Sequence, residues 1–381
     1  MDNALHELET LFEEAKGRSD FDFVLTLINY RGLGTYKLTT NLHEWFEAIG
    51  FYKKLYFAHS GREKTRIGAL LYSTFFENSD FYNIIGSLCR IKLGFKGSSY
   101  LFWKTKKYER LLGIGEKQDF LIELLNDAKK DNIIDFFKEN HFKEIRNTFF
   151  HSAYSLSDEE YIFHDSDPIV INGVGHYGFN VKEFLYPKVE NVISFFDEFQ
   201  KLYLGSFDLY KENMEVTGLF PNPTRITILG SANGLQGFKI KNAVQFFGEW
   251  KDSGIWYNER SDMWEGWNLR MGFDDIQTIE IREQLTRYEN KEDIHRSDTE
   301  FQNLVDKIIE RKETTEIGRA THLLIKFGNL RYKKMQNEQN PFKKKSYSKI
   351  ILPYYYKAAE ISSPSLDITE LKKRIKELEE T

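Results

Sequence analysis

The stretch FKEIRNTFFHSAY, residues 142–154, decides how the N-terminal half of the sequence is interpreted. It places a permanent cation, an amide and a titratable imidazole close together, at Arg146, Asn147 and His151. Apolar residues recur every three or four positions over residues 126–150, which predicts one long helix with a buried face. We therefore expect the three polar side chains to lie on a helix of the protein core.

The pattern R-N-x-x-x-H resembles the signature of the HEPN superfamily, whose ribonuclease members carry it late in a helical bundle. Polar turn residues follow the motif, and a further amphipathic segment runs from Val181 to Tyr203. The resemblance covers about residues 40–205 and implies an endoribonuclease that uses neither a metal nor a cofactor. It also implies an RNA substrate, a homodimer, and a toxin or anti-phage defence role under an antitoxin or other regulatory partner.

The chemistry of metal-free RNA cleavage suits these side chains. It requires a base for the ribose 2′-hydroxyl, an acid for the leaving 5′-oxygen and a cation for the charge that develops on the phosphate. Arg146 and His151 can fill such roles, and Asn147 can orient either of them. At about 100° per residue, Asn147 and His151 share one helix face, whereas Arg146 lies roughly 140° from His151. Because one helix does not gather all three groups, we expect a site shared by two chains, as the resemblance implies.

The same residues have a plainer interpretation. An arginine and a histidine near the end of a helix are often an ion-pair donor and a partner of the helix dipole. HEPN domains also include nucleotide-binding and docking modules without activity. The rival hypothesis is therefore an inactive HEPN-like scaffold that acts through dimerisation or partner docking. HEPN toxins controlled by nucleotidylation carry a tyrosine two residues after the histidine, whereas Tyr154 stands three residues after His151, so we interpret Tyr154 as a packing residue.

Composition indicates a globular protein of two or three domains. The chain has 381 residues, of which 41% are hydrophobic and 15% aromatic, so it can bury sizeable cores. Its net charge of -5 means that any RNA contact must come from a local basic patch. A single cysteine, Cys89, excludes an internal disulfide and a cysteine-based zinc site, and residues 164–176 show no dense metal-ligand pattern. The single cysteine fits a reducing cytoplasm, where we expect the protein, and we expect no membrane segment because no run of 18 apolar residues occurs.

The fold class predicted from periodicity is mainly α, with an N-terminal HEPN-like helical bundle at residues 1–205. Residues 21–28 fit either a strand or a helix, and residues 161–179 predict a small β-hairpin. Besides the segment that carries the motif, helices are predicted over residues 2–16, 41–57, 64–77, 79–93 and 181–204.

Residues 206–381 predict a smaller α+β module for sensing, regulation or RNA capture, after a boundary near 205–222. An Asn233-Gly234 turn predicts a hairpin, since this pair favours the tight turn between two strands. Strands are predicted over residues 225–229, 237–241 and 276–281, and helices over residues 291–326 and 366–380, the last of them capped by Ser365 or Asp367.

Two tracts interleave cations with aromatic rings and are candidate RNA-binding surfaces. Cations neutralise phosphates, and aromatic rings stack on unpaired bases. The alternative for the second tract is a solvated loop beside a buried tyrosine-rich strand. The first tract, residues 92–107, contributes Lys104, Lys106 and Lys107, and the second, residues 331–357, contributes Lys343, Lys344 and Lys345.

Overall fold

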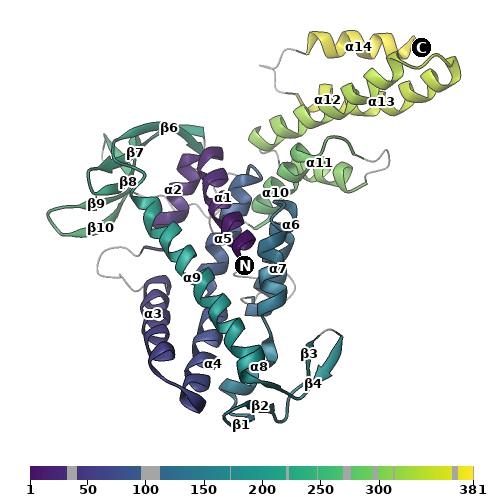
Figure 1. Ribbon diagram of the computed structural model, residues 1–381. Helices are drawn as coiled ribbons and strands as arrows, with labels where there is room; N and C mark the ends of the chain where they lie inside the picture. The colour runs from purple at the N-terminus through teal and green to yellow at the C-terminus, as the bar shows by residue number, and fades with distance from the viewer. Residues whose placement is uncertain are drawn as a thin grey trace. The chain divides into compact units, whose positions relative to one another are not determined.

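Helices predominate in the protein, so the mainly α fold class is confirmed. The chain divides into two units, Met1–Met271 and Gly272–Thr381, coloured purple to green and green to yellow in Figure 1. None of the described helices is long and apolar enough to cross a membrane. The computed structural model describes residues 1–31, 41–95, 112–171, 173–219, 223–246, 248–268, 276–294, 299–311, 314–362 and 368–380.

The first unit begins with a bundle of helices, most of them close to their predicted positions. Residues 21–28, which fitted a strand or a helix, are helical. The predicted final bundle helix corresponds to the π-helical turn η1 followed by α9, and α9 packs against α1, α2, α4 and α7. The elements are α1 (Asp2–Arg18), α2 (Asp20–Asn29), α3 (Leu42–Ala58), α4 (Gly61–Glu77), α5 (Ser79–Lys92), α6 (Ile114–Asp127), α7 (Asp131–Asn140), α8 (Lys143–Phe150), the π-helical turn η1 (Val181–Leu185) and α9 (Tyr186–Phe207).

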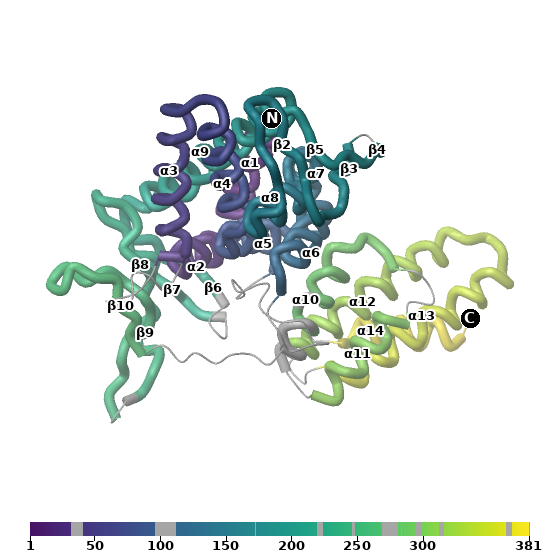
Figure 2. Tube along the Cα trace, turned by 90° about the horizontal axis from the view of Figure 1, so that it is seen from below, coloured from purple at the N-terminus to yellow at the C-terminus, as the bar shows by residue number. Residues whose placement is uncertain are grey.

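Aromatic side chains form the centre of this bundle. Trp45 of α3 packs edge-on against Phe196 of α9, with ring centroids 5.0 Å apart. Phe136 of α7 and Phe195 of α9 stack in parallel at 4.1 Å. Such pairs add specific geometry to the burial of a large apolar surface. Figures 1 and 2 both place α9 among the helices that supply these rings.

The single long helix predicted over residues 126–150 is wrong, because the chain forms the end of α6, then α7, then α8. At the second break, the hydroxyl of Tyr72 donates to the carbonyl of Asn140 at 2.6 Å and accepts from the amide of Phe142 at 2.7 Å. This buried hydroxyl from α4 satisfies backbone groups that the ends of two helices would otherwise leave without partners. The break is therefore stabilised by tertiary contacts.

The hairpin predicted over residues 161–179 corresponds to two small antiparallel sheets. One has the strand order β1-β2-β5, and the other is the hairpin β3-β4. In the first sheet, the rings of Tyr161 and Phe179 stack at 5.2 Å across neighbouring strands. The strands are β1 (Tyr154–Leu156), β2 (Glu160–Phe163), β3 (Ile169–Ile171), β4 (Val174–His176) and β5 (Gly178–Asn180).

A five-stranded antiparallel sheet completes the first unit, in the order β10-β9-β8-β7-β6. The predicted Asn233-Gly234 turn joins β7 and β8, and Gly234 adopts φ 95°, a conformation that suits glycine. The two strands predicted on either side of this turn are confirmed as parts of β7 and β8. The strands are β6 (Met214–Leu219), β7 (Pro223–Ser231), β8 (Gly234–Phe246), β9 (Glu249–Asn258) and β10 (Met263–Trp267).

The predicted domain boundary near residues 205–222 falls inside the first unit, and the division lies after Met271 instead. The reason is that the sheet shares a core with the helices. Phe21 of α2 meets Phe238 of β8 edge-on at 5.2 Å, and a Cβ on Gly218 would come within 2.4 Å of the Phe21 ring. Helix α2 buries most of its surface because it packs between the bundle and the sheet.

The described part of the second unit is helical. The α+β module predicted for residues 206–381 is therefore divided, with its sheet in the first unit and its helices in the second. Its predicted strand at residues 276–281 is wrong, because Ile281 and Leu285 are buried one turn apart on a helix. The helix predicted over residues 366–380 is confirmed by α14, whereas its predicted caps, Ser365 and Asp367, lie outside the described residues. The helical segment predicted over residues 291–326 corresponds to two helices, α11 and the first part of α12, and residues 291–294 are not helical. The helices are α10 (Ile276–Asn290), α11 (Thr299–Arg311), α12 (Thr314–Gln336), α13 (Pro341–Ile361) and α14 (Thr369–Glu379).

The Tyr72→Phe variant should lower the free energy of unfolding by about 1–3 kcal/mol, since it leaves the Asn140 carbonyl and the Phe142 amide without the hydroxyl. Urea unfolding measures this change. Tyr177→Phe is the matched control, because the Tyr177 side chain is 63% exposed, and it should change stability by less than about 0.5 kcal/mol. Equal stability of the two variants would contradict a structural role for the Tyr72 hydroxyl.

Candidate functional site

The motif residues lie on and just beyond α8, a helix of eight residues. Arg146 and Asn147 are half-buried within it, whereas His151 is the exposed C-cap residue. The amide of His151 still donates to the carbonyl of Asn147 at 3.0 Å, and Ser152 then turns the chain with φ 54°. The motif was expected on a long core helix, but it lies on a short helix. Ile145 and Thr148 form the one buried side of this helix.

Arg146 is held by three neighbours. Its Nη1 donates to the Asn147 side-chain oxygen at 2.8 Å, and its Nε lies 2.6 Å from Oε1 of Glu77, the last residue of α4. The guanidinium also lies over the Phe150 ring, 5.6 Å from its centroid. The Arg146 side chain remains 36% exposed although its Nε is buried, so the side chain is partly accessible to a ligand. A positioned and accessible guanidinium is suited to bind a phosphate.

The imidazole of His151 forms no hydrogen bond or ion pair with this cluster, or with any other residue, in the described part of the chain. The neighbouring Phe150 is 47% exposed. One chain thus brings Arg146 and Asn147 together and leaves the imidazole of His151 available to a ligand or to a second chain.

Sequence reasoning missed two polar residues beside Arg146, namely Glu77 and His141. Burial, followed by the positive charge of Arg146, lowers the pKa of His141 to about 4. Its ring packs against Phe76 with centroids 4.6 Å apart. His141 is therefore neutral at pH 7 and adds no charge to the cluster, whereas Glu77 supplies the anion that holds Arg146. Neither belongs to the motif, and Glu77 lies on another helix.

The two basic tracts have different outcomes. Lys104, Lys106 and Lys107 lie outside the described residues. The second tract is neither a loop nor a strand, since it comprises the end of α12 and most of α13. Part of it is structural, because Arg331 is buried and donates to the Ile294 carbonyl at 2.7 Å. The remaining candidates, Lys343, Lys344 and Lys345, lie in the first turns of α13 beside the exposed Phe342.

An aromatic pair on the large sheet, with Trp256 half-buried and Trp267 exposed, was not assigned from the sequence. Trp256 of β9 and Trp267 of β10 stack with centroids 6.0 Å apart and planes 10° apart. The ammonium of Lys239 lies 4.8 Å from the centroid of Trp256. The tryptophan-rich composition of the stretch was visible, but the pairing depends on the strand register, which aligns Trp267 with Gly254. Such rings can stack on a planar ligand.

No known family model, curated protein or solved structure matches the chain. The resemblance to the HEPN superfamily therefore rests on the motif and on its helical context. Among the residues that the structure describes, no group of three or more side chains is placed to hold a metal ion.

His141 should make stability depend on pH between 6.5, its ordinary pKa, and about 4, its folded pKa. In this window the unfolded chain binds a proton that the folded protein does not, so the free energy of unfolding should fall as the pH falls, by up to about 1.4 kcal/mol per pH unit. The His141→Gln variant should lack this contribution. Urea unfolding of both proteins at several pH values measures the difference, and parallel pH profiles would contradict the assignment.

Proposed function

We propose that the protein is a HEPN-type, metal-independent endoribonuclease whose site contains Arg146, Asn147 and His151. The observation that carries this proposal is the arrangement at α8, where Glu77 and Asn147 hold an accessible guanidinium and His151 stands exposed at the helix end. A fixed cation near a free proton carrier is what phosphodiester cleavage by the 2′-hydroxyl requires.

Each residue then has a distinct role. Arg146 binds the phosphate and stabilises the charge that develops on it. Asn147 positions Arg146, because its side-chain oxygen accepts from Nη1 at 2.8 Å. His151 transfers the proton, since a histidine can both accept and donate one near neutral pH. Glu77 is a positioning residue that keeps the guanidinium in place through its ion pair.

We propose a homodimeric active site. Cleavage needs both a base and an acid, whereas each chain offers one exposed motif histidine, His151. Two copies of α8 related by a two-fold axis would supply two histidines and two arginines to one cleft. The exposed Phe150, adjacent to His151, provides an apolar contact for such an interface.

RNA would also contact surfaces away from the motif. Lys343, Lys344 and Lys345 can neutralise phosphates, and the exposed Phe342 beside them can stack on a base. The Trp256 and Trp267 pair offers a second stacking surface. The biological role that accompanies this activity is that of a toxin or an anti-phage defence effector, with an antitoxin or another regulatory partner.

The second candidate function is an inactive HEPN-like scaffold, and a specific contact favours it. The ion pair between Arg146 and Glu77 is what a purely structural arginine would form. In that case Arg146 would tie α8 to α4, and the protein would act through dimerisation or partner docking. Variants at Arg146 can separate the two functions, because an ion pair and phosphate binding make different demands on the side chain.

The Arg146→Ala and His151→Ala variants should each lower RNA cleavage in the presence of EDTA by at least about 100-fold, because the reaction loses its phosphate clamp or its proton carrier. Arg146→Lys should retain the ion pair with Glu77 and most of the stability, yet lose most cleavage, since lysine lacks the planar fork. Lys143→Ala, on the exposed side of α8, is the control. Chelator-resistant cleavage at the wild-type rate by Arg146→Ala or His151→Ala would refute the site, and an inactive wild-type dimer would favour the scaffold.

Replacing Lys343, Lys344 and Lys345 with glutamine should weaken the binding of single-stranded RNA and flatten its salt dependence. Each lost phosphate contact removes about 0.7 from the slope of log K against log salt, so the slope should change by up to about 2. The cleavage rate at saturating RNA should stay the same. Glutamine at Lys372, Lys373 and Lys376 of α14 is the charge-matched control. An unchanged slope in the first triple variant would exclude the α13 lysines from RNA binding.

A further inference from the structure

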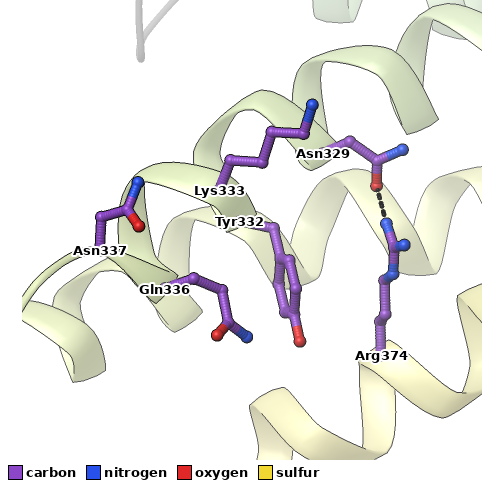
Figure 3. Close-up of a pocket in the computed structure, with 6 residues that line it drawn as sticks. All are labelled: Asn329, Tyr332, Lys333, Gln336, Asn337 and Arg374. Atoms are coloured by element: carbon purple, nitrogen blue, oxygen red, sulfur yellow. Dashed lines mark hydrogen bonds between the residues drawn. The ribbon is translucent and has the colours of Figure 1, made fainter.

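A polar cavity of about 430 Å³ lies in the second unit, between α12 and α14. Four of its lining residues recur on α12 at the spacing i, i+3, i+4 and i+7, which places them on one face of the helix, and Asn337 follows in the turn after α12. Figure 3 shows Asn329, Tyr332 and Gln336 directed toward α14, which carries Arg374, whereas the Lys333 and Asn337 side chains extend away from Arg374. The lining consists of Asn329, Tyr332, Lys333, Gln336, Asn337 and Arg374.

This polar face is partly open to solvent, since Lys333, Gln336 and Asn337 are exposed and Asn329 and Tyr332 are half-buried. Elsewhere on α12, Leu324 and Phe327 are buried in the core of the unit. In ligand sites a few polar groups fix the orientation of the bound molecule, and the amides and cations beside this open space can serve that purpose.

The orientation of Asn329 is determined by its neighbours. Its side-chain oxygen accepts from the hydroxyl of Tyr355 at 2.7 Å and from Nη1 of Arg374 at 2.5 Å. Tyr355 is buried, so it anchors this network in the core. A carbonyl oxygen has two lone pairs, and both are used, which leaves the amide nitrogen of Asn329 as a donor. Figure 3 shows this nitrogen directed away from the bond to Arg374.

The charged residues that line the cavity are both cations. Lys333 and Arg374 line it, and no acidic residue is among its lining residues. Two acids of α14 contact lining residues: Glu370 accepts from Nε of Arg374 at 3.2 Å, and Glu377 accepts from the Tyr332 hydroxyl at 2.7 Å. In the described part of the chain, Lys333 has no ion-pair partner. An exposed ammonium beside a guanidinium and several amides is suited to a phosphate.

We propose that this cavity binds a small phosphate-bearing ligand of the size and kind of a nucleoside monophosphate. Lys333 and Arg374 hold the phosphate, and the amides of Asn329, Gln336 and Asn337 bond to the base or sugar. A cavity of about 430 Å³ is within the range of ligand pockets. This inference goes beyond the proposed ribonuclease, because it concerns a binding site in the second unit that uses none of the motif residues.

The test is isothermal titration calorimetry of the full chain with AMP, GMP, CMP and UMP. Adenosine and inorganic phosphate serve as partial ligands, and a 5′-phosphorylated RNA oligonucleotide distinguishes a free nucleotide from an RNA end. At least one nucleotide should bind at concentrations below about 1 mM, more tightly than adenosine or inorganic phosphate. The Lys333→Glu variant should weaken this binding at least tenfold, because it replaces a phosphate-binding cation with an anion.

Lys372→Glu is the matched control, since Lys372 is exposed on α14 and does not line the cavity. It should bind the nucleotide as tightly as the wild type does. Circular dichroism should show the same helix content for both variants, because Lys333 lies on the surface. Equal affinity of the Lys333→Glu variant and the wild type would overturn the proposal, as would the absence of binding by all four nucleotides.

Two further results would also overturn the proposal. Inorganic phosphate that binds as tightly as the nucleotides would reduce the cavity to a simple anion site. Tighter binding of the phosphorylated RNA than of any nucleotide would make it an RNA-end site. Because binding is measured without RNA cleavage, an inactive motif at Arg146 and His151 would leave the result of this experiment unaffected.

Discussion

The hydroxyl of Tyr72 is the contact on which the arrangement of the candidate site depends. It stands in the middle of α4 and satisfies both backbone groups at the junction of α7 and α8. Five residues further along the same helix, Glu77 holds the guanidinium of Arg146. Helix α4 therefore stabilises the break between α7 and α8 through Tyr72, and it orients Arg146 through Glu77. The position of the motif is thus set by α4 as much as by α8 itself.

Local periodicity accounts for most of the helices that the sequence predicted, because a buried helix face repeats within a few residues. It could not reveal the break after Asn140, since the apolar pattern continues across it and the stabilising hydroxyl is 68 residues away in the chain. The strand predicted at residues 276–281 was wrong for a related reason. A short apolar run is compatible with a strand or with a buried helix. The burial of Ile281 and Leu285 on one helix face shows that this run is helical.

The candidate site was predictable only in part. The adjacency of Arg146 and Asn147 follows from the motif, and their hydrogen bond is local. Glu77 could not be found from sequence, because it reaches Arg146 from a different helix. The α12 face around Tyr332 carried a readable signal in its spacing, but the charge of the tract dominated its interpretation as an RNA-binding surface. Strand register, which pairs Trp256 with Trp267, requires the folded sheet.

The contact between Phe21 and Phe238 has a consequence for how the protein is made. The two residues are 217 positions apart in the chain (238 − 21), so α2 leaves the ribosome long before the sheet that covers it exists. At roughly 5–20 residues per second, the delay is on the order of ten to forty seconds. During that time an apolar surface of the nascent chain faces the solvent or a chaperone. A chain released near residue 205 would keep that surface uncovered permanently and would be prone to aggregate.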